Sequence, residues 1–352
     1  MSHRGTSRFR ARGAVTGIAA GALFAVAPLI AQELETPNLL DTIQRQTSAV
    51  FANCRSAVAQ IEAIDDHGPL SGTGFFVDPN GTLYTCYSVG GETRELTVAF
   101  GGKSYPATRI ISDLRSGLAI LKIEAQTPFL AVGKSRDLNL ASPAMLIGYP
   151  MGMSVAPSFG LVAGFDIKYM GRLLATMHIR VNIPVHRGEG GAPLLNLRGE
   201  VVGMLVASTE SGGAFALPIE AAEKVRRDYL RFQKVRPGWF GIQIGPIDDP
   251  VDGSTAEVMD VLPESPGLKA GVRAGDVLLR VGSRDITSPE DVLDASFYLT
   301  ADDEVTVRVS RADQEIDLKV QPIDSPGEPL PRLAPAFAPD TGLRLRAPAE
   351  NR

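Results

Sequence analysis

The feature that most constrains the fold is a succession of short apolar runs separated by Gly, Pro, Asn and Asp. Turn-forming groups such as those at 78–81 and 197–200 stand between the runs, and this pattern is typical of antiparallel strands. It predicts an all-β dominated fold, built as a barrel or a sandwich. The expected strands lie at 57–64, 74–77, 83–87, 96–100, 118–123, 144–147, 179–183 and 201–206.

The composition excludes several classes of protein. Of the 352 residues, 44% are hydrophobic and 21% are charged, which is ordinary for a soluble globular chain and excludes a disordered or a multi-span membrane protein. The net charge is −5 and no basic block follows the N-terminus, so we expect no nucleic-acid partner. Two Cys and four His leave little for a metal site, and we expect no metal and no cofactor.

The N-terminus has the pattern of an export signal. A stretch with four Arg, 4–12, precedes an uncharged apolar segment, 14–30, and Ala31 offers a cleavage site. The alternative is an uncleaved anchor, which would attach the protein to a membrane. Three Gly and a Pro between residues 13 and 32 weaken a spanning helix. The signal pattern predicts an exported protein, periplasmic or extracellular. Residues 1–31 hold no acidic residue, so their removal leaves a more acidic chain, which fits such a compartment.

Two helical patterns and a change of composition divide the chain. Apolar spacing predicts helices at 39–52 and 218–233, the second with Pro218 at its start. Pro237 and Gly238 indicate a boundary. The expected parts are a signal peptide or anchor (1–31), an N-terminal helical segment (32–56), a strand-rich domain (57–236), a second small domain (237–323) and a disordered Pro/Ala-rich tail (324–352).

Four ordered segments resemble the HtrA (DegP-like) serine proteases. The resemblance implies a chymotrypsin-like double β-barrel, a short linking helix and a PDZ domain of α+β type. It covers roughly Ala57 to Pro322. The matching segments are SGTGFFVDPNGTLYTCYSV at 71–89, ISDLRSGLAILKIEA at 111–125, MLIGYPMG at 145–152 and GEGGAPLLNLRGEVVGM at 188–204.

The chain departs from the family at the three positions of the catalytic triad. Where the family has T-N-x-H-V, Ser88 stands in place of the histidine. Gly117 replaces the aspartate of T-D-L-A-V-L-K, and Gly190 replaces the serine of G-N-S-G-G-P-L. A serine hydrolase needs a nucleophile, a base and an orienting carboxylate. The sequence therefore predicts a pseudoprotease with no catalytic residues.

A replacement constellation is the enzymatic alternative. A dyad of Ser88 or Cys86 with His186 would supply a nucleophile and a base, while we expect His186 to be a solvated loop residue and Glu189 a surface acid. The glycine-rich run Gly188, Glu189, Gly190 and Gly191 leaves two interpretations open. It is either a vestigial oxyanion loop whose N–H groups bind an anion or a peptide carbonyl, or a flexible turn.

The two cysteines also leave alternatives. Cys54 and Cys86 lie in regions that neighbour each other in this barrel type, and an oxidising compartment favours a disulfide between them. The alternative is a pair of buried free thiols.

The second domain resembles the PDZ domains of the HtrA family. Its long match is SPGLKAGVRAGDVLLRVGSRDITSPEDV at 265–292. The resemblance implies that Trp239, Phe240, Gly241 and Ile242 form the carboxylate-binding loop and the first strand of a peptide groove. The alternative is that Trp239 and Phe240 are core residues at a domain junction.

The sequence thus predicts an exported HtrA-like pseudoprotease that binds protein C-termini, peptides or unfolded segments. It would act as an adaptor, a chaperone or a regulator in protein quality control. One alternative is an active serine-type endopeptidase with a non-standard constellation, and another is an oligomeric structural subunit. The resemblance also implies assembly, either as a homotrimer or together with an active relative.

Overall fold

The computed structural model describes residues 38–169, 172–208 and 213–324. The expected signal segment and all but the first residue of the expected tail lie outside this part of the chain. The chain forms two compact units, residues 1–42 and 43–352, and the described strands all belong to the second. Helix α1 (Leu39–Cys54) confirms the expected N-terminal helix. Within the described ranges, the helices are too short or too polar to cross a membrane.

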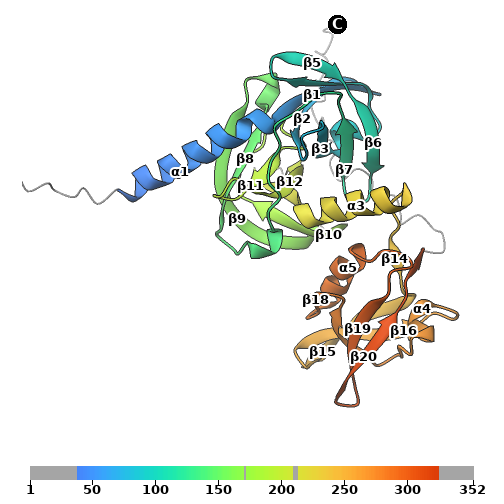
Figure 1. Ribbon diagram of the computed structural model, residues 1–352. Coiled ribbons are helices and arrows are strands. Elements are labelled where there is room, and N and C mark those ends of the chain that lie inside the picture. Colours follow the sequence, from blue (N-terminus) through green and yellow to red (C-terminus); the bar gives the residue numbers. More distant parts are fainter. Residues whose placement is uncertain (1–37, 170–171, 209–212, 325–352) are drawn as a thin grey trace, which may run out of the picture. The chain divides into compact units, whose positions relative to one another are not determined.

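The first barrel region is a seven-stranded antiparallel sheet, ordered β5-β4-β1-β2-β3-β7-β6 (Figure 1). The strand pairing within the described residues leaves this sheet open, and the chymotrypsin-like architecture that the resemblance implied is present. Large side chains from its central strands, including Phe75, Leu83, Tyr84 and Leu121, are buried in its core. Its strands are β1 (Val58–Asp65), β2 (Gly68–Phe76), β3 (Thr82–Cys86), β4 (Arg94–Phe100), β5 (Lys103–Pro106), β6 (Thr108–Asp113) and β7 (Leu118–Lys122).

The second region is a closed barrel with the order β10-β13-β12-β11-β8-β9. Its small core is aliphatic and includes Leu146, Val162, Ile179 and Leu205. The expected all-β dominated fold is confirmed, although the long strand β9 was not predicted. The strands are β8 (Pro143–Gly148), β9 (Ala156–Tyr169), β10 (Arg172–Val181), β11 (Pro193–Leu195), β12 (Val201–Ser208) and β13 (Ala214–Pro218).

Helix α3 (Ile219–Phe232) follows the barrel and confirms the expected linking helix, with Pro218 at its N-cap. The C-terminal domain then forms an antiparallel sheet ordered β15-β16-β17-β19-β20, with β18 beside β17. Strands β14 (Gly238–Trp239) and β21 (Ile323–Asp324) pair separately. The remaining elements are β15 (Ile242–Val251), β16 (Ser254–Val261), α4 (Pro266–Lys269), β17 (Val277–Val281), β18 (Arg284–Asp285), α5 (Pro289–Phe297), β19 (Val305–Arg311) and β20 (Gln314–Val320).

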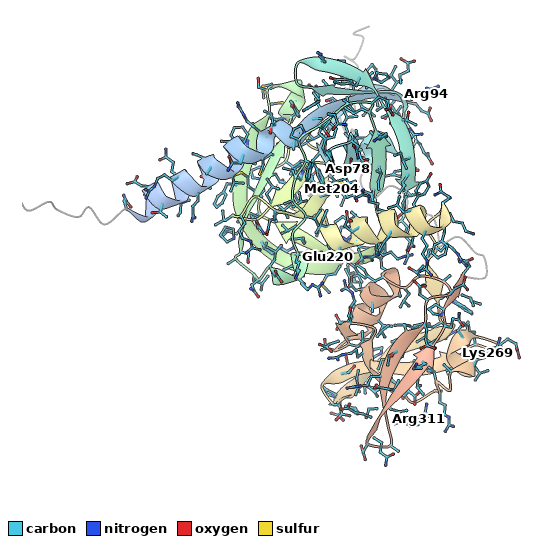
Figure 2. The ribbon with its side chains drawn as sticks, in the orientation of Figure 1. Asp78, Arg94, Met204, Glu220, Lys269 and Arg311 are labelled. Atoms are coloured by element: carbon cyan, nitrogen blue, oxygen red, sulfur yellow. The ribbon has the colours of Figure 1, made fainter. Side chains whose placement is uncertain are left out.

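Local polar contacts fix the elements of this domain. Ser288 caps α5 and forms a capping box with Asp291, which satisfies backbone N–H groups that the helix itself leaves without partners. The carboxylate of Asp276 is buried, and Arg311 on β19, which is labelled in Figure 2, donates to it. The two hydrogen bonds measure 2.6 and 2.7 Å. A buried carboxylate needs such a charged partner, because its desolvation is otherwise costly.

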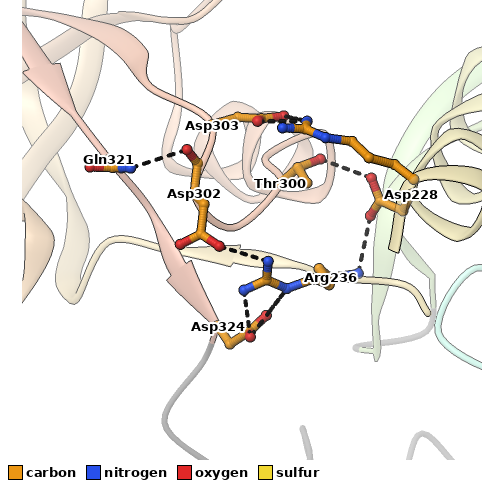
Figure 3. A network of polar contacts seen from close by, with 8 residues as sticks. Asp228, Arg236, Thr300, Asp302, Asp303, Gln321 and Asp324 are labelled. Atoms are coloured by element: carbon orange, nitrogen blue, oxygen red, sulfur yellow. Dashed lines mark hydrogen bonds and ion pairs between the residues drawn. The ribbon is translucent and has the colours of Figure 1, made fainter. Parts of the chain in front are cut away.

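A polar network surrounds the segment between α3 and β14 (Figure 3). The Arg236 guanidinium donates to both carboxylate oxygens of Asp324 and, at 2.7 Å, to Asp302. Asp228 on α3 accepts from the Arg236 backbone N–H at 3.1 Å and from the Thr300 hydroxyl at 2.9 Å. The hydrogen bonds from Arg236 lower the pKa of the Asp324 carboxyl. The network ties Asp302 and Asp324 of the C-terminal domain to Arg236, and Thr300 of that domain to α3.

The expected disulfide is absent, which corrects the sequence prediction. Cys54 and Cys86 are both buried free thiols. The Cys54 thiol lies 3.5 Å from the Gly199 carbonyl oxygen, while the Cys86 thiol lies 3.1 Å from the Ser88 hydroxyl. The two sulfurs therefore lie in different surroundings. Each thiol is buried and packs as a small apolar group.

We predict that neither thiol reacts in the folded protein. Burial excludes reagents and raises the pKa of both thiols, so little thiolate forms near neutral pH. Alkylation of the native protein should leave both unmodified, whereas unfolding in guanidinium chloride should expose two reactive thiols per chain. Protein recovered from an oxidising compartment that has no reactive thiol after unfolding would contradict this prediction and support the bond.

Candidate functional site

The position expected for the general base lies on the short helix α2 (Tyr87–Gly90), directly after β3. Ser88 on this helix is exposed, and its hydroxyl contacts the Cys86 thiol at 3.1 Å. Cys86 itself is 1% exposed, and burial raises the pKa of its thiol. Neither side chain can take a proton from a nucleophile near neutral pH, because a hydroxyl and a protonated thiol are poor bases.

The position expected for the orienting carboxylate is held next to α2 by the backbone. The Tyr87 N–H donates to the Gly117 carbonyl oxygen at 2.7 Å. Gly117 has φ +74°, in the left-handed region, and a Cβ added to it would lie 3.6 Å from Val206. There is thus room for a side chain, but the backbone conformation favours glycine.

The loop expected to hold the nucleophile is clamped by Thr73 on β2. The Thr73 N–H donates to the Gly190 carbonyl oxygen at 2.9 Å, and its hydroxyl donates to that of Gly188 at 2.7 Å. Gly191 has φ +87°, and a Cβ there would lie 2.3 Å from the Thr73 carbonyl oxygen. These contacts define a tight turn in the structure.

The structure brings the three triad positions together. A Cβ added to Gly190 would lie 3.0 Å from the Cys86 sulfur, which in turn contacts Ser88. Gly117 joins the group through Tyr87. At this place the chain offers a hydroxyl, a buried thiol and two glycines, and the Cys86 sulfur borders the space of the missing side chain at Gly190.

His186 and Glu189 pair with each other, and Glu189 corrects the sequence expectation. Its carboxylate was expected at the surface, but the side chain is 2% exposed. It accepts a hydrogen bond from the His186 backbone N–H at 2.6 Å and lies 3.3 Å from the His186 ring. The exposed His186 ring is thus engaged by Glu189, and no hydrogen bond within the described ranges joins it to Ser88 or Cys86.

Two backbone donors of this loop are left open. Within the described ranges, no hydrogen bond uses the N–H groups of Gly188 and Gly190. Gly188 has φ +93°, and a Cβ there would lie 2.4 Å from the Tyr149 carbonyl oxygen, so only glycine fits. Open N–H groups on a rigid turn are the elements of an anion-binding nest.

The loop before β15 has a similar arrangement. The carbonyl oxygens of Phe240 and Gly241 accept from Gly267 and Leu262 at 2.9 and 2.8 Å, whereas their N–H groups make no hydrogen bond within the described ranges. Gly241 has φ +74°, and a Cβ there would lie 2.4 Å from that of Ser265.

The four residues expected in the peptide groove have different surroundings. Phe240 is 9% exposed and belongs to the core of the domain, while Ile242 packs against that core from β15. Trp239 lies on β14, opposite Ile323. Sequence reasoning missed that Ile244 and Pro246 continue this edge of the sheet, for which periodicity alone gave no signal.

Comparisons with known proteins agree with this architecture. The trypsin-like peptidase domain matches residues 72–204, and the PDZ domain matches residues 238–321. Two relatives, each named probable periplasmic serine endoprotease DegP-like, are 29% identical over 74% of this chain (Chlamydia pneumoniae) and 30% identical over 77% of it (Rhizobium meliloti). The chain covers 56% and 57% of their lengths, and so spans about half the length of the curated relatives it matches.

A solved structure described as the HtrA-type protease AlgW with tripeptide matches 80% of this chain and 98% of its own, with a TM-score of 0.66 and 20% identity. That likeness concerns the fold. A trypsin-like peptidase domain followed by a PDZ domain, shared in this order with DegP-like relatives, shows that the chain belongs to the HtrA family.

Proposed function

We propose that this protein is a pseudoprotease of the HtrA family that binds the C-termini of peptides through its PDZ domain. The observation that carries the proposal is the set of residues at the triad positions. Ser88, Gly117 and Gly190 meet at one place, and they supply neither an imidazole nor a carboxylate nor a hydroxyl on the nucleophile loop.

The chemistry of acyl transfer explains why these substitutions matter. The base takes the proton of the nucleophile and later protonates the leaving amine, and the carboxylate fixes the tautomer of the base. Loss of a single member removes most of the rate, and the remainder comes from the oxyanion hole and from binding. In this chain, the N–H groups of Gly188 and Gly190, which make no hydrogen bond within the described residues, could still bind a carbonyl oxygen as an oxyanion hole does.

The enzymatic alternative needs a nucleophile that is accessible and activated. Cys86 is buried, and its pKa is raised by desolvation, which opposes formation of the reactive thiolate. His186 is paired with Glu189. These observations favour the pseudoprotease over a dyad of Cys86 or Ser88 with His186.

The binding function rests on the loop from Trp239 to Ile242. In the part of the chain that the structure describes, the N–H groups of Phe240 and Gly241 make no hydrogen bond, and β16 is the one strand paired with β15. The loop therefore leads into an edge strand. In β-strand addition an extended peptide joins such an edge, and backbone amides hold its terminal carboxylate. The half-buried side chains of Ile242 and Ile244 would contact apolar residues of the ligand.

The cellular role follows from the relatives and the N-terminal pattern. The relatives are named periplasmic endoproteases, and residues 1–31 have the pattern of an export signal. We therefore place the protein in the periplasm, as an adaptor, chaperone or regulator that presents C-termini or unfolded segments. Assembly as a trimer, or with an active relative, belongs to the same proposal.

The first test is for hydrolysis. The protein from residue 32 onward should neither cleave unfolded casein nor react with a fluorophosphonate probe, because Gly190 offers no nucleophile. An active DegP-like relative serves as the positive control. Cleavage or labelling that disappears in Ser88→Ala or His186→Ala would establish the non-standard constellation instead.

The second test is for recognition of a carboxylate. A peptide with an apolar C-terminus should bind with about micromolar affinity, and its amidated version about tenfold more weakly, because a carboxylate held by amides is a charge-assisted contact. Gly241→Pro should weaken binding of the free acid, since proline has no N–H and cannot adopt φ +74°.

Gly253→Ala is the matched control for the second test. Gly253 also has a positive φ, but a Cβ there meets no atom within 4 Å, and the residue lies at the β15–β16 turn. Its affinity in calorimetry should equal that of the wild type. Equal affinity of the wild type for the free acid and the amide would show that the loop does not recognise a carboxylate.

A further inference from the structure

Edge strand β15 exposes a defined set of backbone groups. The Gly241 carbonyl oxygen accepts from Leu262 at 2.8 Å, which turns Gly241 toward β16. Backbone groups of an antiparallel strand alternate in direction, so those of Ile242, Ile244 and Pro246 face the open edge. An added strand would pair with these residues.

Pro246 limits the length of that pairing. Proline has no N–H, so the third outward position cannot donate to an added strand. The pairing of β15 with β16 is also irregular from this point, since it passes from Pro246–Ala256 directly to Val251–Ser254. A peptide whose last residue lies opposite Ile242 is therefore held by its main chain over about four residues, up to Pro246.

Beyond Pro246 the edge becomes acidic. Asp248 and Asp249 are exposed on β15, and Asp252 follows at the turn. None of the ion pairs within the described ranges involves these three carboxylates. Counted from a last residue opposite Ile242, a peptide that continues in the same direction past the ladder brings its seventh and eighth residues from the end near Asp248 and Asp249.

We propose that this edge selects C-terminal peptides in which about four residues form the β-strand contact and Lys or Arg occupies the seventh and eighth positions from the end. The inference rests on the proposed peptide-binding function and adds the charge of the ligand to it. The main chain of the peptide contributes to affinity through the short ladder with β15. The basic residues of the peptide, upstream of that ladder, contribute through charge complementarity with Asp248 and Asp249. Because both partners are solvent-exposed, the charge contribution is small and sensitive to salt.

The test compares two fluorescent decapeptides with the same apolar four C-terminal residues. One has Lys and the other Glu at the seventh and eighth positions from the end. Fluorescence anisotropy with the full mature chain should give an affinity about threefold to tenfold higher for the Lys peptide at low ionic strength. This difference should largely vanish near 1 M salt, where charges are screened beyond about 3 Å.

Paired variants locate the effect. Asp248→Asn with Asp249→Asn should remove the preference for the Lys peptide and leave the affinity for a free tetrapeptide unchanged. The matched control, Asp313→Asn with Glu315→Gln, changes the net charge equally at the exposed β19–β20 hairpin, at the opposite edge of the sheet, and should keep the preference.

Each outcome separates this inference from the function on which it rests. Equal affinity for both decapeptides, or a preference that the Asp248 and Asp249 substitutions do not change, would overturn the inference while leaving peptide binding intact. Absence of binding by the tetrapeptide and by both decapeptides would overturn the proposed function itself, and this inference with it.

Discussion

The contact on which the site depends is the clamp between Thr73 and the loop Gly188–Gly191. Thr73 belongs to the seven-stranded sheet, and the loop belongs to the closed barrel. Two hydrogen bonds from Thr73, together with the collision that any Cβ at Gly191 would make with its carbonyl oxygen, fix the turn without a catalytic side chain. The conformation of this loop therefore depends on contacts with Thr73 and not on a side chain at position 190.

The altered positions are also compatible with stable packing. The buried Cys86 thiol borders the space beside Gly190, and buried Glu189 holds the loop through the His186 N–H. A buried carboxylate is costly unless it is hydrogen-bonded, so Glu189 makes the turn dependent on that contact. The peptide recognition that we propose, by contrast, uses the loop before β15 and the edge of that strand, and needs nothing from the triad positions.

Periodicity predicted eight of the strands that precede α3 and both long helices, because it is a local property of the chain. Ordered motifs predicted the trypsin-like peptidase and PDZ domains. Periodicity missed β9, whose exposed Phe159, Leu161 and Phe165 and whose glycines hide the usual alternation. The burial of Glu189 and the separate surroundings of the cysteines could not be read from sequence, since both depend on contacts between segments far apart in the chain. That Pro246 would end main-chain pairing with an added strand could be inferred only once the structure placed β15 at the edge of the sheet.

Amide chemical shifts test at once whether a peptide contacts the β15 edge and whether it contacts the triad positions. A free-acid peptide with an apolar C-terminus is titrated into the labelled protein, and the peptide is recovered afterwards for its mass. The account predicts shifts at Phe240, Gly241 and Ile242, no shift at Gly188 or Gly190, and an intact peptide. Shifts confined to Gly188 and Gly190, or a cleaved peptide, would contradict it.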